Sequence, residues 1–354
     1  MIMKSNAIIN HSPVKIGFVP SHIGLAKAHI PDDQGNLARS PQGSLILLDG
    51  IEQTCKQAPV AIDVIQVMTF PGVVDKDLDE LINGIKNLGI EPQLILMIGG
   101  VNPMDALDED AAVELLLAPL KVAKRHGIRN VGSTSAEAWM DTPAPKNKEE
   151  YRERVAQIVQ LHHRVYQEAN LEESCIESWS LEYLRPGEMN TFTSISKIQP
   201  VVSVLNKRIG KSFFKILVDA AHCGDGEMSV EENAECIRQL AESGELSVFH
   251  ASVHTTRGCL SSDNGWIAPL LKVFAEVGCL EYAIVEVFKH TDPILEPLRK
   301  YDANHGVDTT YGRAYTDIVI HNLVNLTHQL NYLNAIKLFD GARATTVASK
   351  GVTC

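Results

Sequence analysis

Four segments of the chain place an acidic or imidazole side chain at or near the end of a strand-like apolar run. Glu182 and Asp219 each follow such a run directly, and two later runs carry His250 and Glu286. A carboxylate at the end of a buried parallel strand is costly to desolvate unless a cation or hydrogen-bond donors face it. The pattern therefore predicts that the four side chains share a ligand.

Simpler interpretations compete with a shared ligand. Glu182 and Glu286 could be ordinary strand-end carboxylates in ion pairs, and Asp219 with His222 could cap the loop that follows its strand. Asp219 and His250 complete a ligand set with the two glutamates, and this completeness favours the shared site.

Parallel strands that lie side by side would bring these four side chains to the same edge of a sheet. The chain alternates strand-like with helix-like segments, as such a sheet requires. Strand-like runs at 14–19, 62–68, 93–98 and 130–133 precede the four strands that carry the site. Apolar residues at helical spacing occupy 44–58, 76–88, 108–126, 148–169, 194–205, 230–243 and 267–277. Eight strand-helix units in alternation predict an α/β protein with a closed parallel (β/α)8 TIM barrel. The chain has neither a GxGxxG after its first strand nor a GxxxxGK motif, which argues against the usual nucleotide sites of open sheets.

The length of 354 residues, 45% of them apolar, is enough for one large core. We expect one main domain, a metal-dependent catalytic barrel over residues 1–315. Residues 316–354 are expected to add an extra C-terminal helix, at 317–339, and a loose tail. The apolar residues of this helix recur at i, i+3, i+4 and i+7, so either the barrel or a second subunit should cover them. We expect an intersubunit role for this helix.

The overall composition favours a cytoplasmic protein that acts on small molecules. The formal net charge of −12 and the absence of a basic run argue against nucleic acid as the partner. Seven cysteines without CxxC spacing suit reduced thiols in the cytoplasm. No apolar stretch reaches the length of about 20 residues that a membrane span requires. The sequence thus predicts no nucleic acid and no membrane among the partners.

Four motifs follow one another between residues 170 and 290. They are Leu181-Glu182-Tyr183-Leu184-Arg185-Pro186-Gly187-Glu188 with Asn190-Thr191, Asp219-Ala220-Ala221-His222, Phe249-His250-Ala251-Ser252 with Arg257, and finally Glu286. In order and spacing they resemble the xylose-isomerase-like TIM barrels, and among these the ketose 3-epimerases. The Phe-His-x-Ser context favours His250 as the ligand, although His254 could share its strand face.

The chain also departs from that family. Tyr183 replaces a proline, residues 259–265 replace a Pro-Gly loop, and the chain is longer than typical members. Because loops at the C-terminal face select the substrate in such barrels, the sequence predicts the fold and reaction class rather than one sugar.

The resemblance implies that Glu182, Asp219, His250 and Glu286 bind one divalent metal ion. This donor set suits Mn2+, Mg2+ or Co2+, and the imidazole makes Zn2+ a further candidate. A metal that bridges a carbonyl and the neighbouring hydroxyl acidifies the carbon-bound proton and holds the resulting enediolate. The resemblance makes Glu182 and Glu286 the catalytic pair, one removing this proton and the other returning it.

The resemblance also implies substrate-binding residues. Glu188 and His222 are expected to bind hydroxyl groups, and Arg257 a distal oxygen, although Arg257 could equally form a surface ion pair. His254 is a further candidate for substrate binding.

The expected function is a divalent-metal-dependent sugar or polyol isomerase or epimerase. One alternative is a dehydratase of a cyclic polyol of the inosose type. Another is an endonuclease IV-like metallohydrolase, which would need more metal-binding His and Asp residues and a basic groove. The last is a non-catalytic carbohydrate-binding barrel. Association into a homo-oligomer is expected because members of the family commonly associate.

Overall fold

The computed structural model describes residues 7–21, 28–252, 265–287, 296, 300 and 312–340. Eight parallel strands form a closed barrel in which each strand pairs with its neighbour along the chain and β8 pairs with β1. The strands are β1 Lys15–Phe18, β2 Val64–Thr69, β3 Glu91–Leu96, β4 Asn130–Ser133, β5 Ser178–Glu182, β6 Phe214–Asp219, β7 Leu246–Ala251 and β8 Tyr282–Val285. This topology confirms the predicted (β/α)8 TIM barrel.

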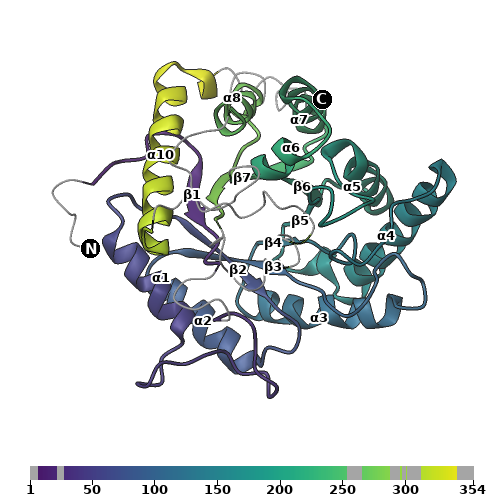
Figure 1. The fold of residues 1–354 in the computed structure, drawn as a ribbon, viewed down its shortest axis with the longest axis horizontal. Coiled ribbons are helices and arrows are strands. Elements are labelled where there is room, and N and C mark those ends of the chain that lie inside the picture. The colour runs from purple at the N-terminus through teal and green to yellow at the C-terminus, as the bar shows by residue number, and fades with distance from the viewer. Residues whose placement is uncertain are drawn as a thin grey trace, which may run out of the picture.

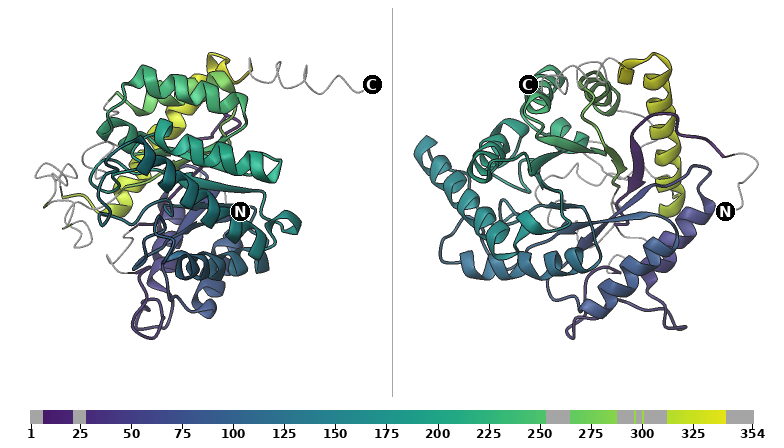
Figure 2. Two further views of the ribbon diagram at one scale, coloured as in Figure 1. Left: turned by 90° about the vertical axis from the view of Figure 1, so that its right-hand side faces the viewer. Right: turned by 180° about the vertical axis from the view of Figure 1, so that it is seen from behind.

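Helices surround the strands on all sides of the barrel (Figures 1 and 2). The long helices are α1 Ile46–Gln57, α2 Asp75–Asn87, α3 Glu109–Arg125, α4 Lys148–Glu168, α5 Ile195–Ile209, α7 Val230–Glu242, α8 Ile267–Val277 and α10 Tyr315–Ala335. Two short elements that the sequence did not indicate are η1 Leu171–Glu173 and α6 Ala220–Asp225, which directly follows β6.

Local signals in the sequence fix several helix ends. Ser229 and Glu232 form a capping box at the start of α7, so each satisfies the other's backbone N–H. The side chain of Asn147 accepts hydrogen bonds from the N–H groups of Glu149 and Glu150 at the start of α4. At the end of α5, Gly210 adopts the left-handed conformation that glycine favours.

The two faces of the strands pack into separate apolar clusters. Ile16 and Phe18 belong to the large cluster between strands and helices, whereas Val19, Val64 and Ile95 belong to a small cluster of alternate strand residues. This alternation places the small cluster inside the barrel. Gly17 allows β1 to approach β2 closely, because a Cβ atom there would lie 1.9 Å from the carbonyl oxygen of Val64.

The C-terminal helix α10 packs on its own barrel. It contacts α1 and α8 on either side and β1 and β8 beneath it, and Figure 1 shows it standing between α8 and α1. The buried residues of its stripe are Ile318, Val319, Asn322, Leu323, Leu326, Thr327, Leu330 and Leu333. The barrel therefore covers the apolar stripe that the sequence predicted, and α10 fills the place of the helix that follows β8. In the described part of the chain, no helix is long and apolar enough to cross a membrane.

Candidate metal centre

Four successive strands carry the predicted ligands at the C-terminal end of the barrel. Glu182 is the last residue of β5, Asp219 is the last residue of β6, and His250 is the penultimate residue of β7. Glu286 directly follows β8. This is the end at which TIM-barrel enzymes build their active sites, because the loops after the strands surround it.

The four side chains converge on one point. One ligand atom from each lies within 4.8 Å of the others. The Nδ1 atom of His250 lies 3.4 Å from Oε2 of Glu286, 3.8 Å from Oε1 of Glu182 and 3.9 Å from Oδ2 of Asp219. All four residues are at most 4% exposed. Three carboxylates and an imidazole are thus held in one small, buried volume.

The electrostatics of this cluster favour a cation. Burial lowers the pKa of His250, but the carboxylates of Glu286, Glu182 and Asp219 outweigh burial and raise this pKa to about 9. Three buried carboxylates facing one another repel, and a divalent ion among them would replace repulsion by coordination. The donor set of three carboxylate oxygens and one ring nitrogen therefore fits a metal ion.

The Ser of the Phe-His-x-Ser motif fixes the backbone beside the cluster. Ser252 donates a hydrogen bond from its hydroxyl to the carbonyl oxygen of Glu286, at 2.9 Å. This bond joins the segment after β7 to the segment after β8, so it holds two of the candidate ligands in register.

His222 lies against two of the candidate ligands. The backbone N–H of Arg185 donates to Nδ1 of His222 at 3.0 Å, so in the neutral ring the proton is on Nε2. That Nε2 atom lies 3.5 Å from Oε1 of Glu182 and 3.7 Å from Oδ2 of Asp219. The His222 ring is therefore oriented with its N–H group toward the centre.

Glu188 lies beside the other ring nitrogen of His222, Nδ1. Its Oε2 atom lies 3.8 Å from Nδ1 of His222 and 3.3 Å from Nε of Arg185. Its Oε1 atom accepts a hydrogen bond of 3.4 Å from the indole N–H of Trp139. Arg185 is only 3% exposed and also pairs with Asp225 at 3.2 Å, so it fixes Glu188 beside the centre.

A buried carboxylate that the sequence did not reveal organises the loop after β5. The two oxygens of Glu137 accept hydrogen bonds from the backbone N–H groups of Asn190, Thr191 and Phe192, at 2.8–3.1 Å. Burial raises the pKa of Glu137, whereas these three N–H donors oppose that rise. Its partners lie more than 50 positions away, so no local pattern could have indicated this role.

Gln66 was also missed. Its Oε1 atom lies 2.7 Å from Nε2 of His250, on the side of the ring that faces away from the carboxylates. The only signal in the sequence is an amide in the middle of an apolar strand.

The structure brings Glu182, Asp219, His250 and Glu286 together and places His222 and Glu188 next to them. The other two predicted residues, His254 and Arg257, lie outside the described residues.

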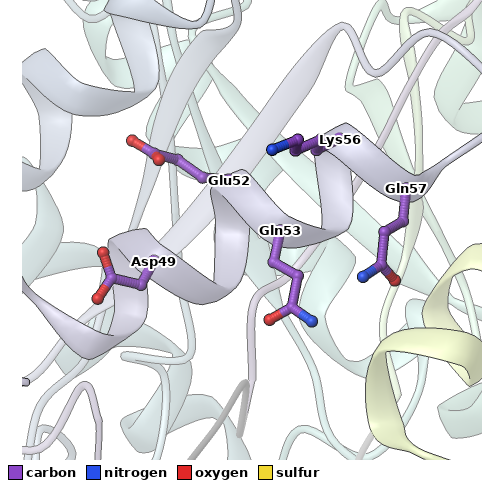
Figure 3. A pocket seen from close by; sticks show the side chains of 5 residues that line it. All are labelled: Asp49, Glu52, Gln53, Lys56 and Gln57. Atoms are coloured by element: carbon purple, nitrogen blue, oxygen red, sulfur yellow. The ribbon is translucent and has the colours of Figure 1, made fainter.

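A separate surface pocket lies on the outer wall of the barrel (Figure 3). Its lining consists of five exposed residues of α1, namely Asp49, Glu52, Gln53, Lys56 and Gln57. The charges there are of both signs and face solvent, which is typical of an exposed helix surface.

By sequence, no family model and no curated protein matches the chain. Solved structures do match over nearly the whole chain. An L-ribulose 3-epimerase is 16% identical, with a TM-score of 0.66 and coverage of 96% of this chain and 100% of that one. A D-allulose 3-epimerase from Methylomonas sp. in complex with D-allulose is 14% identical, with a TM-score of 0.66 and coverage of 91% and 99%. A D-psicose 3-epimerase in the presence of D-fructose is 17% identical, with a TM-score of 0.66 and coverage of 90% and 99%. The chain therefore has the TIM-barrel fold of the ketose 3-epimerases.

Proposed function

We propose that the protein is a divalent-metal-dependent epimerase or isomerase of a sugar or polyol. The observation that carries the proposal is the buried cluster of three carboxylates and one imidazole at the C-terminal end of the barrel. A single buried acid could be structural, but four converging ligand atoms from successive strands suit a cation.

The metal would be held by Glu182, Asp219, His250 and Glu286. Oxygen donors in the majority suit Mn2+, Mg2+ or Co2+, and the ring nitrogen makes Zn2+ a further candidate. When bound, such an ion supplies a Lewis acid that polarises a substrate carbonyl and its neighbouring hydroxyl.

The proton transfers are assigned to Glu182 and Glu286. They come from β5 and β8, which are not neighbours in the barrel, so their carboxylates reach the centre from different directions. A substrate carbon between them would lose its proton to one carboxylate and regain a proton from the other. Regain on the opposite face gives epimerisation.

Recognition of the sugar hydroxyls is assigned to His222 and Glu188, whose geometry beside the centre supports this role. Arg257 and His254 stay in the proposal on the sequence motifs alone. Two of the similar solved structures were obtained with a ketose, D-allulose in one and D-fructose in the other. A small-molecule ketose or polyol is therefore the partner that we propose.

A cytoplasmic homo-oligomer is also part of the proposal. The net charge of −12 and the cysteines without CxxC spacing support a cytoplasmic protein. Resemblance to a family whose members associate supports the oligomer.

The test is isotope exchange. Purified protein with added Mn2+ is incubated in heavy water with a panel of ketoses and inososes, and products are analysed by NMR. Deuterium at the carbon beside the carbonyl of an epimerised or isomerised product would support the proposal. A protein that binds no divalent metal in a titration, and converts no member of the panel, would refute it.

A further inference from the structure

Two glutamine side chains connect the metal cluster to the inside of the barrel. Gln66 and Gln93 are register partners on β2 and β3, and both are 2% exposed. Each lies two positions from a residue of the inner apolar cluster, Val64 and Ile95 respectively, so both amides point inward. The amide N–H of Gln66 donates to Oε1 of Gln93 at 2.9 Å, while Oε1 of Gln66 contacts His250.

The path ends at a carboxylate on the opposite mouth of the barrel. The amide of Gln93 donates to Oε1 of Glu91 at 3.4 Å. Glu91 is the first residue of β3, and it also accepts from Tyr282 at 2.8 Å and pairs with Lys15 at 2.7 Å. The side chains of Glu91 and Lys15 are 29% and 43% exposed, so this end of the path reaches solvent. We call Gln66, Gln93 and Glu91 the amide chain.

The chemistry of Glu91 fixes the direction of every bond in the amide chain. Burial opposes ionisation of Glu91, but Lys15 and Tyr282 outweigh it and lower the pKa of this carboxyl. An ionised carboxylate only accepts hydrogen bonds, so the atom of Gln93 that faces it must be the NH2 group. The oxygen of Gln93 then faces the NH2 group of Gln66.

The same direction determines which nitrogen of His250 carries the proton at this contact. Because the oxygen of Gln66 faces Nε2 of His250, that nitrogen must donate. In the neutral ring Nδ1 then holds the lone pair, and Nδ1 is the atom that lies 3.4 Å from Glu286 and within 3.9 Å of the other two carboxylates. The imidazole is thus oriented to coordinate a metal through Nδ1.

We propose that the amide chain positions the histidine ligand for its metal. Gln66, Gln93 and Glu91 act from behind the imidazole, without touching metal or substrate. The proposal rests on the metal site of the proposed function. Outer partners of metal-bound imidazoles fix the tautomer and the ring orientation, and here the partner extends across the barrel to its far mouth.

The first test is metal affinity, measured by titration calorimetry on the full-length protein. The variants are Gln66→Met and Gln93→Met, which keep chain length and volume but remove the amide. Each should weaken the metal Kd by about 10- to 100-fold, as loss of an outer partner does elsewhere. Glu91→Gln should also weaken metal binding, because an amide, which can both donate and accept, no longer fixes which atom of Gln93 faces it.

Asp63→Asn is the matched control. Asp63 precedes β2, and its carboxylate accepts a hydrogen bond from the N–H of Ile16. The substitution removes one negative charge from the same mouth of the barrel as Glu91→Gln does, without interrupting the amide chain. It should leave the metal Kd at the value of the unmodified protein.

The second test is NMR of the metal-free protein with 15N-labelled histidine. The signal of the proton on Nε2 of His250, assigned by its loss in His250→Gln, should be shifted downfield by its hydrogen bond. In Gln66→Met this signal should be lost by exchange with solvent, because its hydrogen-bond acceptor is gone. In Gln93→Met it should move upfield. Both changes are expected in variants that keep the fold.

The outcomes separate the two proposals. An unmodified protein that binds metal, with a Kd weakened in Gln66→Met and Gln93→Met, but that converts no member of the sugar panel would leave the amide chain standing and remove the proposed activity. A protein that binds no metal would remove both proposals. An unchanged Nε2 signal in both Met variants would overturn the amide chain. So would a metal Kd that weakens as much in Asp63→Asn as in Glu91→Gln.

Discussion

The Nδ1 atom of His250 lies 3.4 Å from Oε2 of Glu286, the shortest of its three contacts with the carboxylates of the centre. These residues come from β7 and β8, which are adjacent in the barrel. Glu286 is therefore both a candidate metal ligand and a candidate base, and its two roles can be separated by substitution.

Glu286→Gln should reduce kcat by a factor of about 10² to 10⁴, the range that general acid-base catalysis contributes. The amide keeps the shape and an oxygen donor but cannot take a proton, so metal binding should weaken less than turnover. Steady-state kinetics with saturating metal would measure this. Glu281→Gln is the control, because Glu281 is exposed and immediately precedes β8 at the opposite end of the barrel. Normal turnover in Glu286→Gln would exclude Glu286 as the acid-base group.

Asp219→Asn should reduce the stabilisation that metal provides, because one anionic ligand becomes neutral, without destabilising the metal-free protein. The side chain of Asp219 caps α6 by accepting from the N–H of Ala221 at 2.6 Å, and the oxygen of Asn can replace this bond. The substitution also relieves repulsion among the buried carboxylates. In the unmodified protein, metal at 100 times its Kd should add about 2.7 kcal/mol to the free energy of unfolding.

Thermal unfolding with and without metal, and after EDTA treatment, would measure this difference. Asp219→Ala is the companion variant, because it loses the cap as well as the charge. A metal-dependent shift in Tm as large in Asp219→Asn as in the unmodified protein would show that Asp219 is not a ligand.

The sequence predicted the barrel because strand-like and helix-like segments alternate, and it predicted the site because four strand-like runs carry an acidic or imidazole side chain at or near their end. Glu182 and Asp219 were found for this reason, as were His250 and Glu286. Gln66 was not, because an amide inside an apolar run gives no sign of its partner, and His250 is 184 positions away. The short helix α6 was missed because Asp219 to His222 has the same pattern as a capped loop.

The C-terminal helix α10 is a second case in which the sequence did not identify a contact between distant residues. Periodicity indicated that one face of α10 must be buried, but no local pattern says which surface covers it. The neighbours of α10 include α1 and β1 from the start of the chain, so the covering surface depended on closure of the barrel.

Cysteine reactivity should divide the thiols by burial. Burial raises the pKa of Cys223 to about 12, as it does for Cys55 and Cys279, so these thiols should remain protonated and react slowly between pH 7 and pH 9. Cys175 is exposed, so its thiol should be alkylated faster than these three. Alkylation with iodoacetamide followed by peptide mass spectrometry would follow each site. Rapid modification of Cys223 in the folded protein would contradict its buried position.

Substitution within α10 should destabilise the barrel itself. Leu330 is fully buried in this helix, and truncation of a buried leucine costs about 2–5 kcal/mol because apolar contacts are lost and a cavity remains. Leu330→Ala should therefore lower the free energy of unfolding by that amount in urea. Tyr332→Ala is the matched control two positions away, since Tyr332 is 64% exposed and its substitution should change the free energy of unfolding by no more than about 0.5 kcal/mol.

Light scattering on both variants shows whether the oligomeric state changes as well. A destabilisation by Leu330→Ala that is independent of protein concentration supports packing on the chain's own barrel, whereas one that disappears at high concentration would assign the stripe to a contact between subunits.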